Sequence, residues 1–345
     1  MSLINNLKQN SRILITGGYG FIGHHLVKKL LKMGHKVTVI DDLSTGSISN
    51  LQPHERLSIH IASVLDKEAM VKAAENCGLA IHLASVVGMM AVTQDARHSY
   101  NVSVNGTKNL FDVMGDKPVV TFSSSAVYGI TENENLIEHE TINRDECMAY
   151  DGDIPGYAMG KMDMEALAVE RFKKGIPTLI IRPFNIIGEG QLGTYGMVLP
   201  RFINKAIEGT ALTVYDDGLQ SRCFSDVKTV LDVLFKLIDI DDVWQSEFNV
   251  FNLGCDKPIT ILGLAELVKT HIRASGIHHD IPVSYIPYSK QFPGKKDVRK
   301  RVPNTTYIES FIGLVQWPTT AEIIQSVAEK AMASIVITDI EVAEA

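Results

Sequence analysis

Short apolar runs alternate with amphipathic segments in the first half of the chain. Residues 12–16 (RILIT) and 36–40 (KVTVI) are rich in β-branched residues, which is typical of buried strands. Between them, apolar residues from Phe21 to Met33 recur at helical spacing, and Gly34 then provides a stop. A strand, a helix and a second strand within about 30 residues predict a βαβ unit with a right-handed crossover.

The same alternation continues to about residue 183. Further strands are expected at residues 79–83, 118–122 and 178–181, and further helices at 102–114 and 157–173. Repeated strand–helix pairs predict an α/β protein of the Rossmann type, with a doubly wound parallel sheet covered by helices on both faces.

The regular rhythm ends after Pro183, where glycines and prolines become frequent. Such punctuation predicts a smaller, mixed α/β unit, which we expect to bind the substrate. We expect the first unit to comprise residues 11–183 and a return segment near 226–252. The second unit would comprise residues 184–225 and 253–335, and residues 336–345 would form a frayed acidic tail.

Composition sets broad limits on the function. Apolar residues make up 45% of the 345 residues, and the formal net charge is −7. An acidic protein is a poor partner for a phosphate backbone, so we expect no nucleic-acid binding. No stretch approaches the ~18 consecutive apolar residues of a membrane span. The four cysteines lack CxxC spacing and the histidines lack metal-ligand spacing, so we expect a reduced cytoplasmic protein with no bound metal.

Three glycines mark the passage from the first expected strand into the first expected helix. Gly17, Gly20 and Gly23 are spaced GxxGxxG, which permits a tight turn, the approach of a diphosphate and close packing of helix on strand. Free N–H groups at the helix start attract phosphate charge. Asp41, at the end of the next strand, can bind an adenosine ribose and would repel a 2′-phosphate. The pattern favours NAD over NADP, and a purely structural glycine turn is the alternative.

Tyr157 and Lys161 form an i, i+4 pair at the start of an expected helix. Both side chains can therefore enter one cleft. A lysine ammonium beside a phenol stabilises the phenolate, so we expect a lowered pKa for Tyr157 and a general base for a sugar hydroxyl. Ser124 follows an expected strand, where ligands bind in parallel sheets, and its hydroxyl can relay the proton. The alternative for Ser124 is a loop serine that caps the following segment.

Taken together, these segments resemble the extended short-chain dehydrogenase/reductases of the NAD-dependent epimerase/dehydratase family, and are most like the nucleotide-sugar 4-epimerases. The resemblance covers about residues 11–320 and rests on TGGYGFIG, IDDLSTG, HLAS, SSSAVYG, YxxxK and RPFN, which occur in the family's order. It implies that Ser124 is the catalytic hydroxyl and Tyr157 the base. Lys161 would activate Tyr157 and bind the nicotinamide ribose.

The resemblance also implies contacts to both ligands. The NAD contacts would be Gly17, Gly20, Phe21, Ile22, Gly23, Asp41, Ser63, Val64, Leu83, Ala84, Ser85, Ser103, Tyr157, Lys161 and Pro183. The UDP-sugar contacts would be Ser124, Ser125, Asn185, Val214, Tyr215, Arg222 and Arg299. The two arginines would bind the diphosphate, because a guanidinium holds phosphate oxygens in bidentate fashion. Ser63 and Ser103 depart from the Asp and Asn that many members carry there.

Two replaced residues bear on the reaction. Related dehydratases have an Asp-Glu pair after the catalytic hydroxyl residue, and hexuronate decarboxylases keep the Glu, whereas this chain has Ser125 and Ala126. Alanine has no proton to give or take. Residues 186–200 also contain no Arg or Lys to hold a sugar carboxylate. We therefore expect a 4-epimerase acting on a UDP-hexose or UDP-N-acetylhexosamine by oxidation at C4 and return of the hydride to the other face.

Other assignments stay open. A nucleotide-sugar dehydratase, decarboxylase or 4-ketoreductase would bind a similar ligand, and a non-catalytic NAD-binding protein could share the fold. The sequence specifies neither the sugar nor the nucleobase. The family pairs helices equivalent to 102–114 and 157–173 between two subunits, and we expect apolar outer faces on them and a homodimer.

Overall fold

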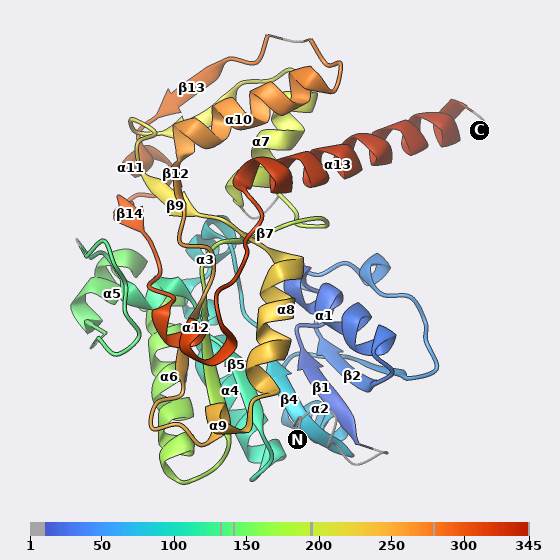
Figure 1. Cartoon of the computed structure of the whole chain (residues 1–345), viewed down its shortest axis with the longest axis vertical. Helices are drawn as coiled ribbons and strands as arrows, with labels where there is room; N and C mark the ends of the chain where they lie inside the picture. Colours follow the sequence, from blue (N-terminus) through green and yellow to red (C-terminus); the bar gives the residue numbers. More distant parts are fainter. Residues whose placement is uncertain (1–10, 132, 141, 194–195, 279, 344–345) are drawn as a thin grey trace.

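A computed structural model describes residues 11–131, 133–140, 142–193, 196–278 and 280–343 (Figure 1). Its centre is a seven-stranded sheet in the order β11-β6-β5-β4-β1-β2-β3, and every pair of neighbours is parallel. The strands are β1 (Arg12–Thr16), β2 (Lys36–Asp41), β3 (Leu57–Ile61), β4 (Cys77–His82), β5 (Val119–Phe122), β6 (Thr178–Pro183) and β11 (Val250–Leu253). The predicted Rossmann-type sheet is confirmed, and its strand order reverses between β1 and β4.

Helices cover both faces of this sheet. They are α1 (Phe21–Lys32), α2 (Lys67–Ala73), α4 (Ala96–Met114), α6 (Tyr157–Lys173) and α8 (Val227–Ile238). Successive strand residues point to opposite faces. In β1, Ile13 and Ile15 therefore join the cluster that contains α1 and α8, whereas Leu14 joins the cluster of α2 and α4 on the other face.

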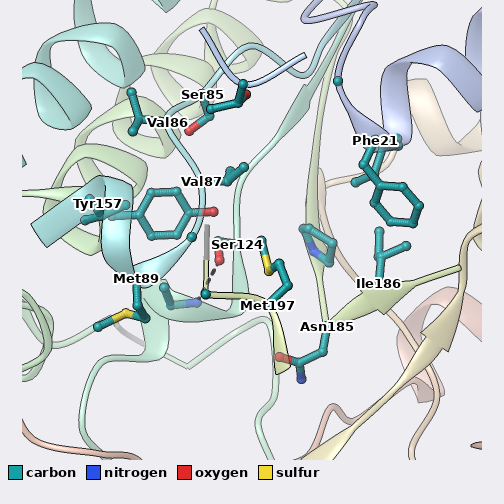
Figure 2. Close-up of a pocket in the computed structure, with 18 of the residues that line it drawn as sticks. Phe21, Ser85, Val86, Val87, Met89, Ser124, Tyr157, Asn185, Ile186 and Met197 are labelled. Carbon is teal, nitrogen blue, oxygen red and sulfur yellow. Dashed lines mark hydrogen bonds between the residues drawn. The ribbon is translucent and has the colours of Figure 1, made fainter. Parts of the chain in front are cut away.

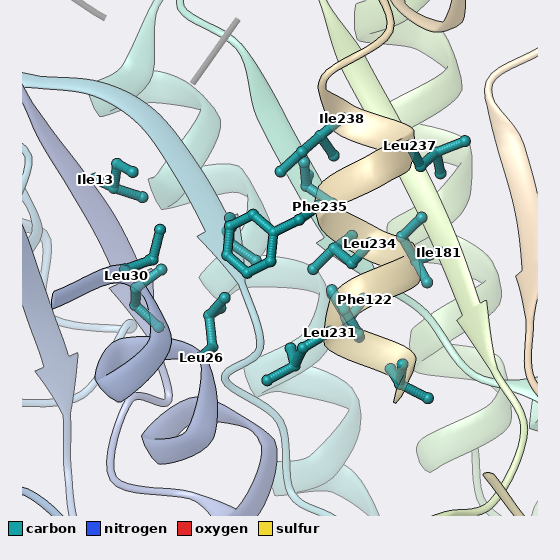
Figure 3. Packing of buried hydrophobic residues seen from close by; sticks show 14 of the residues in the cluster. Ile13, Leu26, Leu30, Phe122, Ile181, Leu231, Leu234, Phe235, Leu237 and Ile238 are labelled. Carbon is teal, nitrogen blue, oxygen red and sulfur yellow. The ribbon is translucent and has the colours of Figure 1, made fainter. Parts of the chain in front are cut away.

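The chain leaves the sheet after β6 and returns to it through α8. Leu231, Leu234 and Phe235 of α8 face Leu26 and Leu30 of α1 in one buried cluster (Figure 3). Burial of each such side chain contributes about 1.5–3 kcal/mol. The following strand, β11, pairs with β6 at the sheet edge. These two elements make up the segment that we expected to return to the first unit.

A smaller unit has its own core. Its strands are β7 (Ile186–Ile187), β8 (Leu212–Tyr215), β9 (Ser221–Cys223), β10 (Ser225–Asp226), β12 (Pro258–Thr260), β13 (Val283–Ile286) and β14 (Lys300–Arg301), and its main helices are α7 (Val198–Ile207), α10 (Ile261–Ala274) and α13 (Thr320–Ala343). Phe202, Leu264 and Ile324 bring the three helices into one buried cluster.

The remaining elements are short. They are the 3₁₀ helices η1 (Ile48–Asn50) and η2 (Ser125–Tyr128), and the helices α3 (Met89–Gln94), α5 (Arg144–Asp151), α9 (Asp241–Trp244), α11 (Tyr288–Gln291) and α12 (Thr306–Ile312).

The C-terminal helix corrects one expectation. We expected residues 336–345 to fray, but α13 continues to Ala343 and extends away from the body of the protein (Figure 1). Ile323, Ile324 and Val327 anchor its first turns in the core of the smaller unit. Once a turn is held in this way, each further residue adds a hydrogen bond at little cost, so the helix propagates.

Several apolar side chains of α4 and α6 are half-buried, among them Phe111, Leu167 and Phe172. Among the described residues, none of the exposed large apolar side chains lies on these two helices. The homodimer therefore stays a prediction. Over the same described residues, no helix is long and apolar enough to cross a membrane.

A buried ion pair joins the sheet to α6. The guanidinium of Arg182 donates from Nε and Nη2 to the two oxygens of Glu165, at 2.9 and 2.8 Å, and both side chains are at most 5% exposed. Ser123 donates to the same carboxylate, and Arg182 also donates to the Tyr128 hydroxyl. Since each charge has several partners, neither is left uncompensated in the interior.

We expect Arg182→Met to destabilise the protein by about 3–5 kcal/mol, because it leaves the Glu165 carboxylate buried without its partner. Urea unfolding measures this change. Lys174→Met is the matched control, since it breaks an exposed pair with Glu170 and costs less than about 1 kcal/mol. Equal losses in the two variants would contradict the prediction.

Candidate active site

A cavity follows the carboxyl edge of the parallel sheet from the glycine loop to the smaller unit. Most residues predicted for the cofactor line it: Gly17, Gly20, Phe21, Ile22, Gly23, Asp41, Val64, Leu83, Ala84, Ser85, Tyr157, Lys161 and Pro183. The predicted substrate residues that line it are Ser124, Ser125, Asn185, Tyr215 and Arg222. Residues from strands far apart in sequence meet here because parallel strands end at a common edge.

Four predicted residues are placed elsewhere. The Ser63 hydroxyl accepts from the Leu65 N–H within its own turn, at 3.3 Å. Ser103 is buried between α4 and α6. A Cβ added at Gly160 would lie 3.1 Å from the Cβ of Ser103. Val214 points into the core of the smaller unit. Arg299 pairs with Asp217 at the surface, outside the cavity.

The glycine loop brings the start of α1 against β1. A Cβ at residue 23 would overlap the Gly17 carbonyl oxygen, and a Cβ at Gly17, whose φ is +73°, would lie 2.8 Å from the Ala84 nitrogen. Gly20 is the residue before the first turn of α1 and offers no side-chain cap. The first-turn N–H groups therefore remain available for an anionic ligand at this end of the cavity.

Asp41 lies at the end of β2, beside the loop. Its Oδ2 accepts from the Tyr19 N–H and its Oδ1 from the Leu43 N–H, both at 2.8 Å. Each carboxylate oxygen has a second lone pair, so Asp41 can still accept two hydroxyl hydrogen bonds. Burial raises its pKa, and the two N–H bonds act in the opposite direction.

A buried hydrogen-bond chain holds the segment after β4. The Thr16 hydroxyl accepts from the N–H groups of Leu83 and Ala84 and bonds to Nδ1 of His82 at 2.7 Å. Burial lowers the pKa of His82 to about 3, so the ring is neutral and serves as a link in this chain. Ser85, the next residue, has a buried hydroxyl with no partner among the described residues.

These features fit NAD. Gly17 and Gly23 let the loop pack closely against its own backbone and against Ala84, so that the first-turn N–H groups of α1 meet the cavity. The Asp41 carboxylate suits two ribose hydroxyls, and Ser85 lines the same cavity. A carboxylate beside the ribose disfavours a 2′-phosphate.

We expect Gly23→Ala to weaken NAD binding by more than ~100-fold, since relief of the overlap with Gly17 costs about 3 kcal/mol. Calorimetric titration with NAD measures this. Gly263→Ala in α10 is the control, because its Cβ would meet only side-chain atoms, of Thr260 at 3.0 Å and Ile259 at 3.2 Å, away from the cavity. Wild-type affinity in Gly23→Ala would refute the assigned cradle.

Tyr157, Lys161 and Ser124 converge on one region of the cavity. The Tyr157 hydroxyl points into the space beside Ser124 (Figure 2). Lys161 Nζ lies 5.9 Å from the centroid of the Tyr157 ring and donates to the Phe122 carbonyl oxygen at 2.6 Å. The Ser124 hydroxyl accepts from the Ala126 N–H at 3.1 Å, which orients it at the start of η2.

The acidity of Tyr157 differs from our expectation. Burial raises its pKa to about 12, and the hydrogen bond with Ser124 opposes this rise only in part. Burial also lowers the pKa of Lys161 to about 7, although Glu165 favours its charged form. The predicted lowering of the Tyr157 pKa was therefore wrong for the protein alone, because loss of hydration outweighs an ammonium that is directed toward the Phe122 carbonyl oxygen.

The far end of the cavity carries cations, although not the expected pair. Arg222 lines it and is held by Asp297 Oδ1 at 2.8 Å. Arg301 lies there in place of Arg299, 5% exposed, with its Nε unpartnered among the described residues. Arg301 is opposite Arg222 in the parallel β14–β9 ladder, and no local sequence signal reveals that register.

Arg201 is a second cation that the sequence analysis missed. It lines the cavity from α7, donates to the Tyr215 hydroxyl at 3.0 Å, and has a buried Nε with no partner among the described residues. Asn185 lines the same end and donates to the Cys223 carbonyl oxygen at 2.9 Å. Guanidinium groups of residues that line a cavity suit an anionic ligand.

The space between the two ends has an apolar wall. Val86, Val87, Met89 and Met197 surround the Tyr157 hydroxyl (Figure 2). Together the cavity offers a dinucleotide cradle, a phenol with a serine partner, and a cationic far end.

Comparison with known proteins identifies the family. Residues 13–254 match the model of the NAD dependent epimerase/dehydratase family. The chain belongs to this family of enzymes, and its cofactor is NAD.

Individual relatives in the family differ in activity. The chain is 30% identical to a UDP-N-acetyl-alpha-D-glucosaminuronate decarboxylase of Bacillus cytotoxicus, over 86% of this chain and 90% of that protein. It is 28% identical to a putative UDP-glucose 4-epimerase of Methanocaldococcus jannaschii, over 76% of this chain and 83% of that protein. A solved UDP-N-acetylglucosamine 4-epimerase of Methanobrevibacter ruminantium M1, in complex with UDP-N-acetylmuramic acid, is 25% identical with a TM-score of 0.79, over 95% and 100% of the two chains.

Proposed function

We propose that the protein is an NAD-dependent nucleotide-sugar 4-epimerase that acts on a UDP-sugar. The single observation that carries this proposal is the composition of the reacting region: Tyr157, Ser124 and Lys161 meet in it, and Ala126 takes the place of the acid/base residue of related dehydratases. Epimerisation needs only removal and return of a hydride and a proton at one carbon, and this set can provide the proton steps.

Each residue has a distinct task in that reaction. Bound NAD supplies a hydride acceptor for C4 of the sugar. Tyr157 takes the proton from the C4 hydroxyl and later returns it, and Ser124, which lies beside the phenol, relays that proton. Lys161 contributes positive charge near the phenol ring when it is protonated.

The far end of the cavity suits the diphosphate of the nucleotide sugar. Arg222, Arg301 and Arg201 line it from three different elements. Guanidinium groups bind phosphate oxygens with directed, charge-assisted hydrogen bonds. This arrangement supports a nucleoside diphosphate as the carrier of the sugar.

A decarboxylase acting on a UDP-uronate is the second candidate. Several relatives are named as UDP-glucuronic acid decarboxylases. The absence of cations in residues 186–200 argued against an acidic sugar, but Arg301 and Arg201 reach the cavity from other segments. Oxidation at C4 makes a sugar carboxylate a β-keto acid, which loses CO₂ as the C5–C6 electron pair moves into an enolate, and Ala126 does not prevent that step.

Incubation with UDP-glucose, UDP-N-acetylglucosamine and UDP-glucuronate, without added NAD, tests the reaction. We expect products of unchanged mass, and NMR would show inversion at C4. Tyr157→Phe should keep NAD bound and the fold intact while turnover falls by roughly 10²–10⁴-fold, since it removes the proton acceptor. Loss of CO₂ would support the decarboxylase instead, and full activity of Tyr157→Phe would exclude the assigned base.

Arg301→Met separates a role on the diphosphate from a role on a sugar carboxylate. If Arg301 binds the diphosphate, KM should rise roughly 30-fold or more for every UDP-sugar, because a buried charge-assisted contact is lost. A rise confined to UDP-glucuronate would assign the residue to the sugar carboxylate. Arg299→Met is the control, since Arg299 pairs with Asp217 outside the cavity and its loss should leave KM unchanged.

A further inference from the structure

The turn that carries Tyr157 is held by a carboxylate outside the cavity. Tyr157 is the first residue of α6, and Gly156 before it has no side chain to cap the helix. Asp151, the last residue of α5, is buried and accepts three backbone hydrogen bonds. They come from the N–H groups of Gly156 (2.8 Å), Ala158 (3.0 Å) and Met159 (2.9 Å).

These three donors enclose Tyr157 on both sides along the chain. First-turn N–H groups have no acceptor within their own helix, so they need one from outside. A carboxylate at this position also interacts favourably with the positive end of the helix dipole. Its bonds are charge-assisted, and two oxygens shared among three donors define one position for the turn.

We propose that Asp151 is the positioning residue that fixes the Tyr157 hydroxyl relative to Ser124 and the bound sugar. It touches neither the cavity nor a reacting atom, and it acts through the backbone of residues 156–159. The proposal rests on the proposed function, in which Tyr157 is the base.

Two glycines between α5 and α6 allow this contact. Gly152 directly follows Asp151 with φ of +93°, a conformation that turns the chain back and that other residues adopt at a cost. Gly156 packs tightly, because a Cβ there would lie 3.2 Å from the Ala96 Cβ and 3.4 Å from the Asp151 carboxyl carbon. A serine or asparagine cap at residue 156 would therefore be crowded, and the cap comes from α5 instead.

The same contact has an electrostatic cost for the base. The negative charge of Asp151 raises the pKa of Tyr157, after the larger effect of burial and alongside Tyr150. The other groups that face Tyr157 are Ser124 of η2, which lowers its pKa, and Lys161 of α6 over its ring. Lys295 is the nearby cation whose charged form Asp151 favours.

Asp151 thus has two opposite effects on Tyr157: it fixes the position of the residue, and its charge raises the pKa of the phenol. The variant Asp151→Asn separates these two effects. Asp151→Asn keeps one acceptor oxygen, loses the other and removes the charge. Loss of the acceptor loosens the turn, and an error of about 1 Å in a reacting group costs roughly 10²-fold in rate. Loss of the charge lowers the pKa of Tyr157, so the limb of the kcat profile that rises as Tyr157 loses its proton must move to lower pH.

The experiment compares Asp151→Asn with Asp66→Asn. Asp66 caps α2 by accepting from the Ala69 N–H at 3.0 Å, and it lies outside the cavity, so its variant reports the loss of charge at a helix cap that has no contact with Tyr157. For Asp151→Asn we expect kcat to fall roughly 10²-fold, KM for the UDP-sugar to stay within about twofold, and the rising limb to move to lower pH. Asp66→Asn should keep the wild-type kcat and pH profile.

A shifted limb with an unchanged maximal kcat would overturn the positioning role, as would a pair of variants that lose only thermal stability. Tyr157→Phe, measured alongside, distinguishes the two proposals. If it is active, the base is wrong; if it is inactive while Asp151→Asn is normal, only the inference about Asp151 fails.

If Asp151→Asn does not fold, amide hydrogen exchange on the wild-type protein tests whether Asp151 anchors the turn. The amides of residues 156, 158 and 159 should exchange slowly despite their place at a helix start, because the carboxylate protects them. Slow exchange together with an unfolded variant supports Asp151 as the anchor of this turn. Exchange as fast as that of an uncapped first turn would overturn the proposal.

Discussion

The contact between Gly23 and the Gly17 carbonyl oxygen is the constraint on which the site depends. It lets α1 begin directly above the end of β1, so that the free N–H groups of the helix face the edge where all the parallel strands end. The Thr16–His82 chain places the Ala84 backbone on the other side of the same loop. The cofactor cradle is therefore a property of backbone packing, and only Asp41 adds a charged side chain to it.

Burial and nearby charged groups determine the pKa values of Tyr157 and Lys161. Burial alone drives Tyr157 and Lys161 toward their neutral forms, which is the opposite of what a phenolate base requires. Glu165 works against this trend for Lys161, and Arg182 holds Glu165 in place from the sheet. Asp151 fixes the turn of Tyr157 from α5. Tyr157 and Lys161 are thus supported by acidic and basic side chains that do not themselves line the cavity.

The choice among reactions of the family depends on small differences in the reacting region. The family's shared chemistry needs one hydroxyl, one phenol and one ammonium, and all three are present around the same space. What distinguishes the members is the additional acid or base, and Ala126 is buried and inert. The cations at the far end come from α7, β9 and β14, which are remote in sequence from Tyr157 and Ser124.

Local patterns determined much of this protein. The strand and helix periodicities predicted the parallel sheet, and the GxxGxxG loop, Asp41 and the Tyr157–Lys161 pair predicted where the cavity would lie, because each depends on residues close in sequence. Tertiary structure alone decided the rest. Arg301 replaced Arg299 in the cavity through the register of two short strands, and burial reversed the expected effect on the Tyr157 pKa. Register and burial both depend on which segments distant in sequence pack together, and a local sequence pattern does not specify those contacts.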